Sequence, residues 1–106
     1  MTYREELQHV IHERHGVHSH HVQSVSVTEK HNGRVIWDGV VEVFKLQGHP
    51  QATHAYAWIH ETDDPNQPKR SDAVLNIPPA TTPEDAVRVA IIRDLLDAEA
   101  RAYETR

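Results

Sequence analysis

The stretch of sequence that decides the fold is His54-Ala55-Tyr56-Ala57-Trp58-Ile59-His60. Small or aliphatic side chains occupy its odd positions, and ring-bearing side chains occupy its even positions. A period of two is typical of a β-strand, whose successive side chains point to opposite faces of a sheet. We therefore predict a strand over Thr53–Glu61. Because small residues allow helices to pack closely, we expect the odd positions to face the core.

Three further segments of the chain have strand patterns. They cover Val22–Glu29, Arg34–Leu46 and Asp72–Ile77. The turn Lys30–Gly33 joins the first two as a hairpin, because Gly33 can adopt the positive φ that such turns require. A glycine inside a strand marks a bend or a close approach, so we expect Gly39 to relieve crowding beside Trp37.

Helices are predicted at both ends of the chain. The first covers residues 3–15, because Thr2 and Glu5 have the spacing of a capping box and Gly16 can end the helix. The second opens at Thr82-Pro83, a capping hydroxyl followed by a proline suited to the first turn. Its expected apolar face consists of Ala86, Val87, Ala90, Ile91 and Leu95. The order α-β-β-β-β-α predicts an α+β fold, an antiparallel meander with both helices packed on one face of the sheet.

The length and composition of the chain limit what it can be. At 106 residues it is the size of one domain, and we expect residues 1–106 to share one core. The absence of cysteine excludes disulfides and thiolate zinc sites. Met1–Glu6 does not resemble a signal peptide, and two arginines interrupt the apolar run Ala86–Leu96. We therefore expect a cytoplasmic protein with no membrane partner.

The charge balance argues against a nucleic-acid partner. Eleven Lys and Arg residues stand against sixteen Asp and Glu residues, which gives a net charge of −5 with neutral histidines. Nucleic-acid binding draws most of its free energy from the neutralisation of phosphates by Lys and Arg. Since the basic residues are scattered along the chain, we expect no nucleic-acid partner.

Strand alternation also predicts an uncovered sheet face. We expect Val41 and Val43 to face the core with the alanines of the third strand, because the reverse register would bury Glu42. The opposite face then has an apolar strip with a polar rim, as interaction surfaces do. Its candidate residues are Asp38, Val40, Glu42, Phe44, His54, Tyr56, Trp58, His60 and Val74. Trp58 is the expected anchor of a homodimer formed through this face.

These residues belong to a longer pattern that resembles a bacterial family. The pattern comprises WDGVVEVF (Trp37–Phe44), Gly48-His49-Pro50, Tyr56-Ala57-Trp58, Leu75–Pro79 and the opening of the second helix. Short bacterial proteins of unknown function carry it, and the resemblance covers most of the chain beyond residue 22. Because that family has no established activity, the resemblance implies a bacterial source and assigns no catalytic residue.

The expected topology is also similar to that of double-stranded-RNA-binding domains, which place two helices on one face of an antiparallel sheet. Those domains grip phosphates with a lysine cluster at the start of the second helix. The matching stretch here is Thr82-Pro83-Glu84-Asp85, whose acidic residues would repel phosphates. The similarity therefore implies a fold and no RNA binding.

Ten histidines are the compositional oddity of the chain, and six of them fall between residues 9 and 21. His9, His12 and His15 are candidate metal ligands, because imidazoles suit zinc, nickel and copper. Their spacing matches no established metal motif, and histidines near the end of a helix interact favourably with its dipole. We favour solvated histidines, with a metal-binding protein as an alternative, and expect no cofactor.

An enzymatic or small-molecule-binding site is another alternative. In the expected register Asp38 lies near His60 and Glu42 near Tyr56, so a carboxylate–imidazole pair could act as a general base with Tyr56 as a proton donor. The candidate residues around a cleft closed by a partner subunit are Asp38, Glu42, His54, Tyr56, Trp58 and His60. An open sheet surface gives a substrate little enclosure, so we favour a non-enzymatic protein. The sequence thus predicts a small interaction module that self-associates through a sheet face bearing Tyr and Trp.

Overall fold

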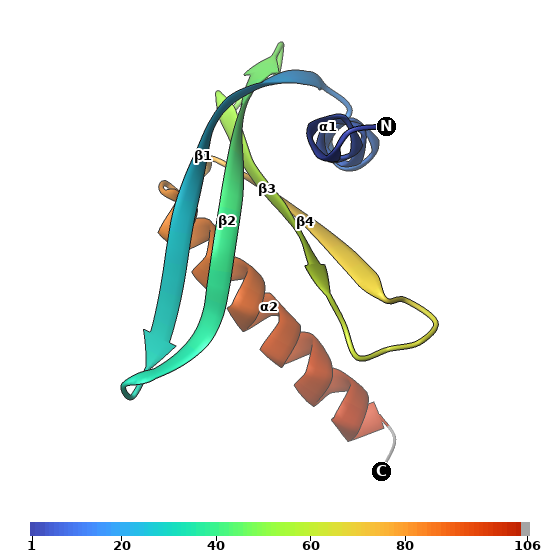
Figure 1. The fold of residues 1–106 in the computed structure, drawn as a ribbon, viewed down its shortest axis with the longest axis vertical. Helices are drawn as coiled ribbons and strands as arrows, with labels where there is room; N and C mark the ends of the chain where they lie inside the picture. Colours follow the sequence, from blue (N-terminus) through green and yellow to red (C-terminus); the bar gives the residue numbers. More distant parts are fainter. Residues whose placement is uncertain (105–106) are drawn as a thin grey trace.

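The structure, a computed structural model, describes residues 1–104 of the chain. Within that range it contains two helices and four strands (Figure 1): α1 (Tyr3–His15), β1 (His18–His31), β2 (Arg34–Gln47), β3 (His54–Glu61), β4 (Lys69–Leu75) and α2 (Pro83–Glu104). The strands form one antiparallel sheet in the order β1-β2-β3-β4. The predicted element order and meander are therefore confirmed. Neither helix in the described range is long and apolar enough to cross a membrane.

The starts of both helices and the end of α1 depend on the predicted local signals. Thr2 Oγ1 accepts a hydrogen bond from the Glu5 amide at 3.2 Å, and Thr82 Oγ1 accepts one from the Asp85 amide at 3.1 Å. Gly16 adopts φ +71° and donates its amide to the His12 carbonyl at 2.9 Å. These bonds satisfy backbone groups that a helix end would otherwise leave without a partner.

The register between β2 and β3 differs from the expected one by one residue. Val43 pairs with Tyr56 and Phe44 pairs with Ala55. Since side chains alternate along a strand, a shift of one residue moves a whole set to the other face. Val41 and Val43 therefore share a face with Tyr56 and Trp58, whereas we expected them beside the alanines.

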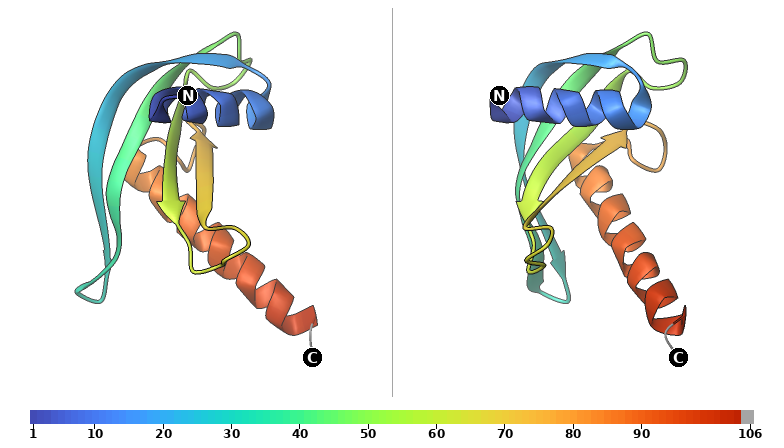
Figure 2. Two further views of the ribbon diagram at one scale, coloured as in Figure 1. Left: turned by 45° about the vertical axis from the view of Figure 1, so that its right-hand side comes forward. Right: turned by 90° about the vertical axis from the view of Figure 1, so that its right-hand side faces the viewer.

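The two helices cover opposite faces of the sheet, so the expectation that both pack on one face is wrong (Figure 2). The core under α2 consists of Val27, Val41, Val43, Tyr56, Trp58, Val74, Ala80, Ala86, Val87 and Ala90. The core under α1 consists of Leu7, Ile11, Phe44, Leu46, Ala52, Ala55, Ala57 and Ala73. The physical reason is that β3 is apolar on both faces. Its alanines allow α1 to approach closely, while its aromatic face offers a large apolar surface against which α2 packs.

Part of the sheet is split. The pairing between β2 and β3 covers Glu42–Lys45 and His54–Ala57, so residues 34–41 of β2 pair with β1 alone. The β1–β2 hairpin therefore projects as a two-stranded arm (Figure 1). The rings of Trp37 and Trp58 bridge the gap edge to face, with centroids 5.7 Å apart.

Gly39 accommodates this aromatic contact. A Cβ at Gly39 would lie 3.1 Å from the Trp37 ring, closer than an ordinary van der Waals contact. The prediction that Gly39 relieves crowding beside Trp37 is confirmed.

We predict that Trp58→Ala lowers the free energy of unfolding by about 3–5 kcal/mol, as for a large core truncation. Trp58 is 2% exposed and packs beneath α2. Val40→Ala is the control, because Val40 is 47% exposed on the arm and should change stability by less than about 0.5 kcal/mol. Urea unfolding measures both. A small loss for Trp58→Ala would mean that α2 does not cover this face in solution.

Candidate functional site

The predicted interaction face does not exist as one surface. Tyr56, Trp58 and Val74 are buried beneath α2, whereas Phe44 and Glu42 are buried on the α1 side. The one-residue difference in register separates these two groups, and the helices cover both. A partner could reach the Tyr/Trp face only by displacing α2, so we correct the assignment of these residues as an exposed strip.

The remaining candidates of that face lie apart. Val40 and Asp38 are exposed on the arm, where Asp38 Oδ1 accepts a hydrogen bond from Thr28 Oγ1 at 3.0 Å. His54 is half-buried with its Nδ1 2.9 Å from Thr53 Oγ1. His60 Nε2, also on a half-buried side chain, lies 3.3 Å from Asp72 Oδ2.

The structure also does not assemble the predicted enzymatic cleft. Glu42 and Tyr56 lie on opposite faces of the sheet, and the carboxylate beside His60 belongs to Asp72 rather than Asp38. The Tyr56 hydroxyl donates to the Thr81 carbonyl at 3.1 Å. Burial raises the pKa of Tyr56, and the nearby carboxylates of Asp85 and Glu84 raise it further, so the phenol stays protonated.

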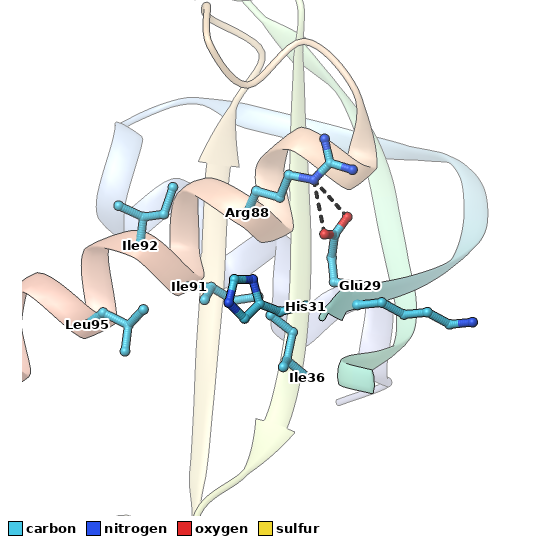
Figure 3. Close-up of a pocket in the computed structure, with 8 residues that line it drawn as sticks. Glu29, His31, Ile36, Arg88, Ile91, Ile92 and Leu95 are labelled. Carbon is cyan, nitrogen blue, oxygen red and sulfur yellow. Dashed lines mark hydrogen bonds and ion pairs between the residues drawn. The ribbon is translucent and has the colours of Figure 1, made fainter. Parts of the chain in front are cut away.

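An apolar groove lies between the arm and α2 (Figure 3). We call it the hairpin groove; its volume is about 550 Å³, and Glu29, Lys30, His31, Ile36, Arg88, Ile91, Ile92 and Leu95 line it. Ile36 reaches the groove from a β-bulge, because the register shift between Glu29 and Lys30 leaves it as an extra residue on β2.

An ion pair closes one end of the hairpin groove. Arg88 Nε lies 3.0 Å from each carboxylate oxygen of Glu29, whose side chain is buried. The hydrogen bond and the charge of Glu29 raise the pKa of Arg88, so the guanidinium remains charged. The pair fixes the start of α2 against β1 and satisfies a carboxylate that would be costly to bury alone.

The outer side of α2 carries a ridge of exposed aliphatic side chains. Ile92, Leu95 and Leu96 are 56%, 62% and 60% exposed. We call these three residues the α2 ridge. A second, shallower groove of about 360 Å³ lies along its other side, lined by Pro79, Val89, Ile92, Arg93, Leu96 and Asp97. A ridge between two grooves is the surface that helices use to pack against one another.

Sequence reasoning placed Ile91 and Leu95 in the core, but Ile91 is only half-buried and Leu95 is exposed. The sequence does carry a signal of this exposure, which is the width of the apolar pattern around the helix. Ile91-Ile92 and Leu95-Leu96 cover more of the helix circumference than one sheet face can bury.

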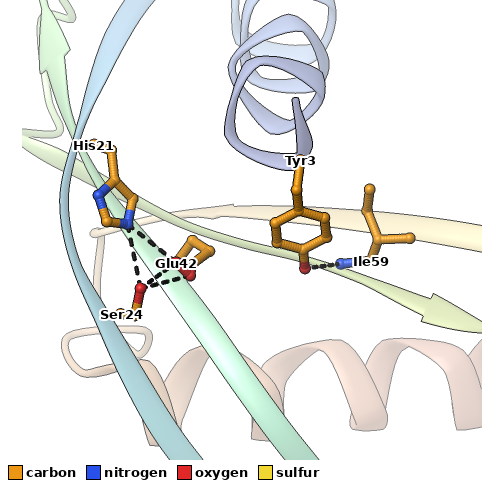
Figure 4. A network of polar contacts seen from close by, with 5 residues as sticks. All are labelled: Tyr3, His21, Ser24, Glu42 and Ile59. Atoms are coloured by element: carbon orange, nitrogen blue, oxygen red, sulfur yellow. Dashed lines mark hydrogen bonds and ion pairs between the residues drawn. The ribbon is translucent and has the colours of Figure 1, made fainter. Parts of the chain in front are cut away.

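A polar network surrounds Glu42, which is 4% exposed (Figure 4). Ser24 Oγ donates to both carboxylate oxygens, at 2.9 Å to Oε2, and His21 Nε2 lies 3.0 Å from Oε1. A β-bulge at Val22 brings His21 and Ser24 to the same face although they are three residues apart. Strict alternation would separate them, so sequence reasoning placed Ser24 on the face of Glu42 and missed His21.

The residue types Ser, His and Glu occur in acyl-transfer enzymes, but their arrangement here is different. A catalytic histidine uses one ring nitrogen for the carboxylate and the other for the serine. Here Ser24 and Glu42 both approach His21 Nε2, and the Ser24 hydroxyl proton points to Glu42. We interpret the network as structural, because it satisfies a buried carboxylate.

The candidate metal ligands engage different partners. His9 Nε2 lies 2.9 Å from Glu13, the His12 ring stacks on His18 with centroids 4.6 Å apart, and His15 Nε2 lies 3.0 Å from the Ala73 carbonyl. The described part of the chain contains no group of three or more His, Asp or Glu side chains placed to hold a metal ion.

Comparison with known proteins adds no functional assignment, because no protein-family model, curated protein or solved structure matches this chain. The resemblance to a bacterial family and the similarity to double-stranded-RNA-binding domains therefore stay predictions. The helices on opposite faces depart from the arrangement on which the second similarity was based.

We predict that Ser24→Ala lowers the free energy of unfolding by about 1–3 kcal/mol, because it removes the hydroxyl that satisfies both oxygens of buried Glu42. Thr28→Val is the matched control: Thr28 makes the same kind of bond on the same strand, but to exposed Asp38. That control should change stability by less than about 0.5 kcal/mol. Equal losses in urea unfolding would contradict the special role of the Glu42 network.

Proposed function

We propose that this protein is a cytoplasmic interaction module that forms a homodimer through the α2 ridge and the hairpin groove. The observation that supports this is the contiguous exposure of Ile92, Leu95 and Leu96 beside an apolar groove. Single exposed aliphatic residues are ordinary on protein surfaces, but contiguous apolar patches with a polar rim are typical of interfaces.

The large accessible surface of the chain favours a partner that covers a substantial part of it. The chain has an accessible surface of 7332 Å², whereas a compact monomer of its mass, 12.1 kDa, exposes about 6,000 Å². Its radius of gyration is 14.5 Å, against about 13 Å for a compact chain of this length. The difference in area exceeds the roughly 800 Å² that each partner buries in an interface of standard size.

The projecting elements supply this additional surface. Both the arm and the C-terminal half of α2 extend away from the end of the molecule where α1 lies (Figure 2). Val35 and Ile36, near the tip of the arm, are each about half exposed, and Ile36 faces the hairpin groove. A second copy would cover aliphatic side chains on both projecting elements at once.

The charges at this surface favour a protein partner over a nucleic acid. Glu84 and Asp85 stand in the first turn of α2, and Asp94 pairs with Arg70 at 2.7 Å. Glu29 lies beside Arg88, so the surface is mixed in sign rather than a basic patch. Phosphate binding needs a cluster of cations, and the carboxylates among these arginines would repel a phosphate.

We predict that Leu95→Glu converts the dimer to a monomer, because the interface would then bury two unpaired carboxylates, one from each copy. The measurement is molar mass by light scattering or sedimentation at several protein concentrations. Val40→Glu introduces the same charge in place of another exposed aliphatic residue, outside the proposed surface. It should leave the dimer intact.

Urea unfolding of Leu95→Glu separates loss of the dimer from loss of the fold, because an exposed position should not destabilise the isolated chain. A wild-type protein that stays monomeric at high concentration would refute the proposal.

A further inference from the structure

We infer that the two copies pair through their α2 helices in an antiparallel orientation, with Arg88 of each copy facing Glu99 of the other. This inference rests on the proposed dimer and specifies its geometry. It follows from the order of charged and apolar residues along the exposed side of α2.

The relevant residues form one stripe. Arg88, Ile92, Leu95 and Glu99 follow at intervals of four, three and four residues, and all four are exposed. Such spacing places side chains on one face of a helix, here the face opposite Ala86, Val87 and Ala90. The stripe begins with a positive residue, continues with two aliphatic residues and ends with a negative residue.

An antiparallel copy complements this stripe at every position. Arg88 meets Glu99, and Ile92 meets Leu95, with a twofold axis crossing the helix between Arg93 and Asp94. The symmetry repeats each contact, so the pair gains two ion pairs and two apolar contacts. A parallel copy in register would instead place Arg88 beside Arg88 and Glu99 beside Glu99. The helix dipoles also favour the antiparallel orientation.

Arg88 can serve both copies. Its guanidinium has five N–H donors. The Arg88 hydrogen bonds to Glu29 use Nε, and Nη1 lies 3.7 Å from Asp85, beyond hydrogen-bond distance. The side chain is 59% exposed despite these contacts. The Glu29 pair therefore holds Arg88 in position while leaving donors for a carboxylate of the partner.

Cysteine crosslinking tests the orientation directly, because the chain contains no cysteine. Residues 88 and 99 lie about 16 Å apart along one helix, so only one orientation can bring each pair within disulfide distance. We expect an equimolar mixture of Arg88→Cys and Glu99→Cys to form a disulfide-linked heterodimer on mild oxidation. Either variant alone should give little linked dimer.

The control is Glu13→Cys, an exposed glutamate on α1 that reports random collisions. Self-linking of Arg88→Cys alone would establish a parallel pair and overturn the inference, while the proposed dimer would stand. A dimer by sedimentation with no linkage above the Glu13→Cys level would also overturn it. A monomeric wild type would instead refute the proposed function.

Exchanging the charges of residues 88 and 99 provides an independent test, because the apolar contacts of the interface stay unchanged. Glu99→Arg should weaken dimerisation about 3–10-fold, because two exposed ion pairs become two repulsive pairs. Adding Arg88→Glu to the same chain should restore part of the affinity, because it forms both ion pairs again with their charges exchanged. Arg88→Glu alone is the reference, since this change also places a second carboxylate beside buried Glu29. Glu13→Arg makes the same change of charge on α1 and should leave the dimer dissociation constant unchanged. Absence of any restoration in the doubly exchanged chain, with its fold intact by circular dichroism, would contradict the Arg88–Glu99 pairing.

Discussion

The pairing of β2 with β3 is the constraint on which the rest of the structure depends. Four residue pairs, from Glu42 with Ala57 to Lys45 with His54, join the two halves of the sheet. This register places Val43 beside Tyr56 and so creates one aromatic and aliphatic face, which only a helix with small apolar residues can cover closely. Ala86, Val87 and Ala90 give α2 that surface. The alanines on the opposite face of β3 admit α1.

The short pairing also explains the open shape of the molecule. Where β2 leaves β3, the arm depends on β1 and on the contact between Trp37 and Trp58. A two-stranded ribbon is marginally stable by itself, so this aromatic contact and the Glu29–Arg88 pair anchor the arm to the core. The same divergence creates the hairpin groove. The fold and the candidate interface are thus both consequences of the short pairing between β2 and β3.

Buried Glu42 helps to select the register in which β1 pairs with β2. Its carboxylate finds Ser24 and His21 only because the bulge at Val22 turns both toward it. If β1 slipped by one residue against β2, Ser24 and His21 would turn to the other face, and the buried Glu42 carboxylate would lose these partners at a cost of several kcal/mol. The network therefore favours the observed pairing of β1 with β2 over its neighbours.

The sequence by itself determined the features that depend on neighbouring residues: the order of elements, the caps at Thr2, Gly16 and Thr82, and the need for Gly39 beside Trp37. The tertiary structure decided the register and the faces that the helices cover. Alternation in β3 shows that its two faces differ, but when both are buried it cannot show which helix covers which. The bulges at Val22 and Ile36 add one residue each without a local signature. An apolar residue such as Leu95 looks the same in the sequence whether it lies in the core or beyond the edge of the sheet. Its exposure depends on how far α2 extends past the sheet, which only the tertiary structure shows.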